Sequence, residues 1–109
     1  LRDLEKLDLF HVQQYARLVT KMDTIKEGEG TLLDNMTFVM GSGLGSGFHH
    51  TCSDLPTLIA GSGGGLFETN RHDKHPKGTP IANLWLSMIQ VMGVKASKLG
   101  DSTGALKLA

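Results

Sequence analysis

Two glycine-rich loops, each directly after a short apolar run, constrain the fold of this chain more than any other feature. Residues 36–40 run into the glycines of 41–47, and residues 55–60 run into Gly-Ser-Gly-Gly-Gly at 61–65. Both apolar runs have the length and composition of β-strands, and glycine lets the backbone after them turn with positive φ. Strands that end in such loops are typical of ligand sites in α/β proteins.

Helical periodicity precedes the first of these strands. From Leu4 to Ile25, apolar residues recur at steps of three and four, which predicts an amphipathic helix over about 3–26. His11 lies on this apolar stripe, where we expect a core or boundary histidine.

A second helix is predicted over about 80–92. Thr79 suits the N-cap, Pro80 suits the first helical position, and Gly93 ends the pattern. The helix is apolar on most sides, so we expect it to be buried, with one narrow polar stripe that lines a cavity or hydrogen-bonds a neighbouring segment. The polar residues of this stripe are Asn83, Ser87 and Gln90. The order helix, strand, strand, helix predicts an α/β fold, with two or more short strands flanked by these helices, in a single domain over 1–109.

The charge balance excludes several classes of partner. Eleven Lys and Arg residues match eleven Asp and Glu residues, so no net field attracts nucleic acid or an anionic membrane surface. The longest strongly apolar segment, residues 81–94, is too short to span a bilayer. A single cysteine, Cys52, excludes a disulfide within the chain. We therefore expect neither nucleic acid nor a membrane as a partner.

The glycine loops do not match a nucleotide-binding motif. Counted from Gly41, the dinucleotide pattern requires glycine where Ser46 stands; counted from Gly43, it requires glycine where Phe48 stands. No Gly-Lys-Ser/Thr sequence follows any glycine either. The favoured interpretation is that the bare backbone passes close to a neighbouring element, which leaves open the approach of a ligand to the same backbone.

Side chains that can bind metal ions gather on or just after the two loops. One group is His49, His50, Cys52 and Asp54, and the other is His72, Asp73 and His75. Their spacing matches no zinc template, and loop histidines without a template are more often solvated or hydrogen-bonded. Their expected convergence at the same ends of two strands favours ligation. We therefore assign His50 and His72 as candidate metal ligands, and a divalent metal is the one cofactor that the sequence suggests.

Other polar residues are candidates for contacts with a ligand. They are Ser42, Asp54, His75 and Asn83. No residue is assigned a catalytic role, because a nucleophilic Cys52 beside His50 would need an activating environment that the pattern does not demonstrate. Asp54, which precedes Leu-Pro, is equally consistent with a turn cap.

Several further motifs follow one another along the chain. They are Gly-Thr-Leu-Leu-Asp at 30–34, Gly-Ser-Gly at 41–43, His50 ahead of Asp54-Leu-Pro56, Leu-Ile-Ala-Gly at 58–61, Gly-Gly-Gly at 63–65, Arg71-His72, Gly-Thr-Pro-Ile-Ala-Asn-Leu at 78–84, Met-Gly-Val at 92–94 and Gly-Asp-Ser-Thr-Gly at 100–104. In this combination the chain resembles the HxxSHH-motif bacterial proteins, a family of unknown function. The resemblance covers nearly all 109 residues.

The resemblance implies a fold and an incomplete site. Family chains are several times longer, and this chain is similar to their C-terminal part, starting just after the point where His-x-x-Ser-His-His would lie. The family is similar to the alkaline phosphatase and sulfatase-like fold, a three-layer α/β sandwich with metal ions at its strand ends. There the strand matching 36–40 would deliver Ser-Asp-His-Gly, whereas this chain has Gly-Ser-Gly-Leu at 41–44. A complete two-metal site therefore does not carry over. His50, and after it His72, are the residues most similar in position to remaining ligands.

Two functions follow as expectations from the resemblance. The first is a non-catalytic fragment of a secreted or periplasmic alkaline phosphatase-like protein. The alternative is part of a metal-dependent phosphate- or sulfate-ester hydrolase whose remaining site residues lie in the missing N-terminal region. Because a sheet cut from a larger fold leaves unpaired edges and apolar helix faces, we expect a homo-oligomer or contacts with that N-terminal part.

Overall fold

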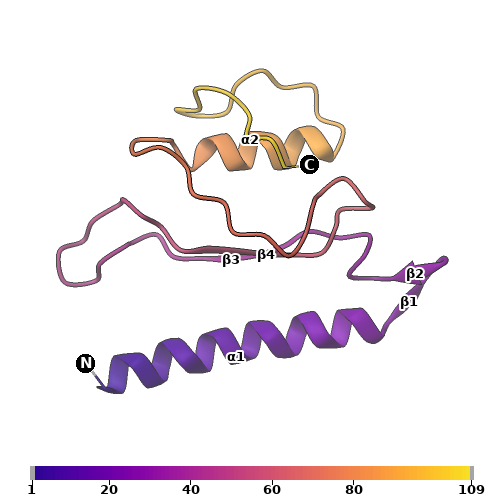
Figure 1. Ribbon diagram of the computed structural model, residues 1–109, viewed down its shortest axis with the longest axis horizontal. Coiled ribbons are helices and arrows are strands. Elements are labelled where there is room, and N and C mark those ends of the chain that lie inside the picture. The colour runs from indigo at the N-terminus through magenta and orange to yellow at the C-terminus, as the bar shows by residue number, and fades with distance from the viewer. Residues whose placement is uncertain (1, 109) are drawn as a thin grey trace. The chain divides into compact units, whose positions relative to one another are not determined.

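The computed structural model describes residues 2–108 and divides the chain into two compact units, Leu1–Gly64 and Gly65–Ala109 (Figure 1). We call them unit 1 and unit 2. The predicted α/β class with two helices that flank the strands along the chain is confirmed, in a mixed arrangement with two small antiparallel sheets among the described residues, and two further short strands that were not predicted precede the predicted pair. Within residues 2–108, neither helix is long and apolar enough to cross a membrane.

Helix α1 (Arg2–Thr24) opens unit 1, close to its predicted bounds. Its first turn carries acidic residues and its last turn carries Lys21, a charge order that the helix dipole favours. Tyr15 attaches α1 to the rest of the unit. Its ring stacks on that of Phe38, with the centroids 5.0 Å apart and the planes 9° from parallel, and its hydroxyl donates to the carbonyl oxygen of Phe38 at 2.8 Å. Burial raises the pKa of Tyr15, and a backbone hydrogen bond with Ala60 partly opposes this rise.

A short hairpin and a tight turn follow α1. Strands β1 (Lys26–Glu27) and β2 (Gly30–Thr31) pair in antiparallel fashion. The Asp34 carboxylate then accepts hydrogen bonds from the backbone N–H of Thr31 at 2.8 Å and from its hydroxyl at 3.0 Å. Such side-chain-to-backbone bonds fix a turn locally, without help from distant parts of the chain. This turn is the structural role of the Gly-Thr-Leu-Leu-Asp motif.

Strands β3 (Phe38–Gly41) and β4 (Thr57–Ala60) form the longer hairpin of unit 1. They are antiparallel, with Phe38 opposite Ala60 and Gly41 opposite Thr57. The expected convergence of the two glycine-rich loops is therefore wrong. Antiparallel pairing puts the loop after β3, residues 42–56, and the loop after β4, which begins at Gly61, at opposite ends of the pair.

Unit 2 is built on helix α2 (Ala82–Val91), which is shorter than predicted. The predicted N-cap is wrong, since the Thr79 hydroxyl donates to the carbonyl oxygen of Pro76 at 2.8 Å and caps nothing in α2. The cap position is occupied by Ile81, with no side-chain cap bond. The predicted burial is confirmed: Leu86 is 1% exposed, and its helix neighbours Ala82, Asn83, Leu84 and Ser87 are also buried. After α2 the chain folds back, and we call residues 99–108 the tail (Figure 1).

Candidate functional site

The loop between β3 and β4 carries three of the candidate residues, Ser42, His50 and Asp54. Its stem continues the hairpin, because the N–H of Gly45 donates to the carbonyl oxygen of Thr51 at 2.8 Å and Ser46 bridges to Thr51. Glycine is required at position 45, since a Cβ there would collide with the carbonyl oxygen of Ser53. The favoured interpretation of the first glycine loop, close approach of two backbones, is therefore confirmed at Gly45.

His50 and Asp54 lie in this loop in left-handed backbone conformations, with φ of 50° and 52°. Both side chains are exposed, as is Cys52, whose sulfur lies 4.0 Å from the carbonyl oxygen of His50. The Ser42 hydroxyl forms hydrogen bonds only locally, donating to the carbonyl oxygen of Leu44 at 2.9 Å. Histidine and aspartate adopt this conformation more readily than most residues, so the loop geometry is a sufficient reason for both residue types.

The second glycine loop has a structural role within unit 1. Gly61 has φ +91°, and a Cβ there would collide with the carbonyl oxygen of Met36. The N–H of Gly64 donates to the carbonyl oxygen of Asp34 at 2.8 Å, and the hydroxyl of Ser62 donates to the same oxygen at 2.7 Å. This loop therefore packs on the turn that follows β2, at the end of the hairpin opposite to His50.

The metal candidates are divided between the units, with His50 in unit 1 and His72 in unit 2. His72 and His75 are both exposed. Over residues 2–108, no group of three or more His, Cys, Asp or Glu side chains is arranged to hold a metal ion. A metal shared by His50 and His72 stays a prediction.

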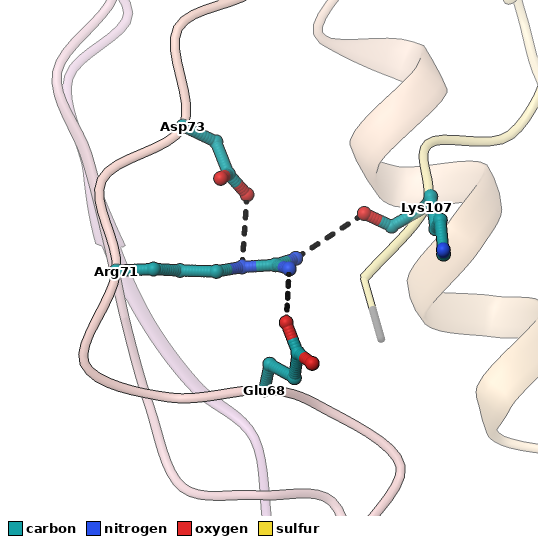
Figure 2. Close-up of polar contacts among 4 residues, drawn as sticks. All are labelled: Glu68, Arg71, Asp73 and Lys107. Carbon is teal, nitrogen blue, oxygen red and sulfur yellow. Dashed lines mark hydrogen bonds and ion pairs between the residues drawn. The ribbon is translucent and has the colours of Figure 1, made fainter.

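Arg71, next to His72, organises the segment before α2 (Figure 2). Its guanidinium pairs with the carboxylates of Glu68 and Asp73, each at 3.0 Å, and donates to the carbonyl oxygen of Lys107 at 3.2 Å. The backbone N–H of Glu68 also donates to the carbonyl oxygen of Leu108, at 3.0 Å. Sequence reasoning missed this cluster. Its only local signal is the spacing Glu-x-x-Arg-x-Asp at 68–73, which predicts ion pairs but not the contact with the tail.

Asn83, a predicted ligand contact, and Ser87 both bind the tail. The Asn83 amide donates to the hydroxyl of Thr103 at 3.0 Å, and its oxygen accepts the N–H of Thr103 at 2.8 Å. The Ser87 hydroxyl accepts the N–H of Leu106 at 2.6 Å and lies 2.9 Å from the carbonyl oxygen of the same residue. Of the two predicted roles for the polar stripe, hydrogen bonding to a neighbouring segment is the one observed.

We call the groups that hold the tail the tail seat: the side chains of Arg71, Asn83 and Ser87 and the backbone N–H of Glu68. Beside it lies an open cavity of about 440 Å³, walled by the tail together with Leu66, Gln90 and Val91. Two side chains of the seat, Asn83 and Ser87, are buried polar groups that converge on the tail. No protein-family profile, no curated protein and no solved structure matches this chain.

Proposed function

We propose that the chain is a non-catalytic part of a larger protein of the HxxSHH kind, and that the first half of α1 packs against another part of that protein. We call residues 2–13 the arm. Every residue of the arm is exposed, although it contains five large apolar side chains. They are Leu4, Leu7, Leu9, Phe10 and Val12, between 42% and 62% exposed. This exposed arm is the observation that carries the proposal.

The physical reason is the weakness of helices on their own. A helix in water gains most of its stability from packing an apolar face, and lengths below about 15 residues are marginal in isolation. No residue of α1 is buried, and Tyr15, just beyond the arm, makes its stacking contact with β3. An arm with this composition gains stability when a second surface covers it. In a three-layer alkaline phosphatase-like sandwich, the central sheet of the larger protein would supply that surface.

Self-association of the isolated chain tests this proposal, because an uncovered apolar arm also packs on a second copy. At about 0.1 mM we expect oligomers by light scattering, and we expect the double variant Leu4→Gln, Leu7→Gln to be monomeric. Both leucines lie on the stripe that continues to Tyr15. Leu9→Gln is the matched control, because Leu9 lies on the other side of the helix and its loss leaves that stripe intact.

Two outcomes would contradict the proposal. One is a wild-type chain that remains monomeric at this concentration. The other is a loss of association that is equally large for Leu9→Gln, which would show a general effect of hydrophobicity and no role for one face. Near-ultraviolet circular dichroism of Tyr15, the only tyrosine, checks that unit 1 remains folded in each variant.

The second candidate function is part of a metal-dependent phosphate- or sulfate-ester hydrolase. The observation in its favour is the exposure of His50 beside His49 and Cys52 in one loop, where their donor atoms are accessible to an ion. For this function we expect zinc to bind with heat measurable by titration calorimetry at about pH 7.5, since ligation needs deprotonated imidazole. His50→Ala should weaken binding at least tenfold, whereas His11→Ala in the arm should leave it unchanged. No heat up to about 1 mM zinc would exclude this candidate.

A further inference from the structure

We infer that the tail seat is a binding site for an extended peptide segment, and that the tail of a second copy of this chain is its partner in trans. The proposal is independent of the arm, because it concerns unit 2 alone. It rests on which atoms of the tail the seat contacts. The atoms that it contacts are mostly main-chain atoms, which any copy of the segment presents in the same way.

The contacts form a nearly continuous row along the tail. They reach the N–H of Thr103, the N–H and carbonyl oxygen of Leu106, and the carbonyl oxygens of Lys107 and Leu108. Only the bond from Asn83 to the Thr103 hydroxyl depends on the identity of a tail side chain. Main-chain hydrogen bonds of this kind are the usual source of affinity when a protein recognises an extended peptide.

Two side chains of the seat have their hydrogen-bond partners in the tail. Asn83 and Ser87 stand one helical turn apart on the same face of α2 and are only 5% and 4% exposed with the tail in place. Without the tail, the Asn83 side chain would lose both of its hydrogen-bond partners in the chain. The tail of a second copy supplies the same two partners, so an exchange of tails leaves none of these bonds unmade.

The segment between α2 and the tail allows the tail to leave its seat. Met92 is 80% exposed and Val94 is 51% exposed, so few packing contacts oppose movement there. Gly93, in this segment, has φ of +88°, a conformation in which glycine turns the chain without strain. When two copies exchange their tails, every contact forms again in the partner. The fraction of exchanged chains therefore depends on the protein concentration compared with the effective concentration of the chain's own tail at its seat.

Complementation between two defective variants tests the proposal. The seat variant Asn83→Ala, Ser87→Ala keeps an intact tail, and the tail variant Leu106→Pro keeps an intact seat but lacks the N–H that Ser87 accepts. We expect each variant alone to be monomeric once the arm is blocked by Leu4→Gln, Leu7→Gln. Mixed at about 0.1 mM each, they should form a one-to-one complex by analytical ultracentrifugation, with one tail seated in trans. Two monomers in the mixture would overturn the inference.

A second measurement uses the wild-type chain and does not depend on the folding of a variant. A fluorescent peptide of residues 99–108 should bind saturably, at least tenfold more weakly than it binds the tail variant, because the cis tail competes at an effective concentration of about 1 mM. The same peptide with Leu106→Pro, which lacks the N–H that Ser87 accepts, should bind at least tenfold more weakly than the native peptide. If the wild-type chain binds the native peptide no better than the proline peptide up to about 10 mM, the seat is not open to exchange and the inference fails.

Discussion

Replacing Gly61 with alanine is expected to destabilise unit 1 by about 3 kcal/mol. Two effects add. The backbone of Gly61 has φ +91°, which is strained for any residue with a Cβ, and that Cβ would collide with the carbonyl oxygen of Met36 and lie 2.7 Å from that of Leu33. Both obstacles are backbone atoms, so they cannot move aside as a flexible side chain can. Urea unfolding followed by the near-ultraviolet signal of Tyr15 measures the change.

Gly64→Ala is the matched control for this prediction. Gly64 lies in the same loop with φ +72°, but nothing lies within 4 Å of the position that its Cβ would take. Its substitution should therefore cost only the conformational strain, about 1 kcal/mol. Equal losses at both positions would show that collision with the 33–36 backbone contributes nothing.

Replacing Ser87 with alanine is expected to destabilise unit 2 by about 2 kcal/mol. The hydroxyl of Ser87 is buried and accepts the N–H of Leu106 at 2.6 Å. Alanine removes that acceptor and leaves the N–H of the half-buried Leu106 without its partner, which destabilises the folded state more than the loss of both partners would. Trp85, the only tryptophan, lies on α2 and reports unfolding of this unit by fluorescence.

Gln90→Ala provides the comparison within the same helix. The Gln90 side chain is exposed and donates to the carbonyl oxygen of Ala96 at 2.7 Å. Water can replace this bond, so we expect a loss below about 1 kcal/mol. A loss at Gln90 as large as that at Ser87 would contradict the prediction that the burial of Ser87 makes its bond to the tail the more stabilising of the two.

Both helices and the strands β3 and β4 could be predicted from the sequence because their signals are local, whereas the short β1–β2 hairpin was not predicted. The periodicity from Leu4 to Ile25 fixed α1 to within about two residues, as expected for a long periodic segment. The antiparallel direction of β4 relative to β3 could not be predicted from the residues of either strand. Residues 42–56 are long enough to cross over between parallel strands, and only their lack of a helical pattern signals a hairpin.

For the candidate residues too, features that depend on neighbouring residues could be predicted, and contacts with distant residues could not. The narrow stripe of Asn83 and Ser87 was visible in the sequence, but its partner, 19 or 20 residues later, was not. Arg71 is tied to Lys107 over 36 residues, and its role was missed altogether. His11 was predicted to lie in the core or at its boundary and is in fact exposed, as is every residue of the arm.

The turn at Thr31 and Asp34 also bears on the order of folding. Its hydrogen bonds join residues three positions apart, so it can form before any long loop closes. Once formed, it holds the carbonyl oxygen of Asp34 ready for Ser62, 28 residues away, and for Gly64. Formation of this turn is therefore expected to precede closure of the β3–β4 hairpin, which orders a longer stretch of chain and costs more conformational entropy. Unit 1 then acquires these two long-range hydrogen bonds at an oxygen that is already in position.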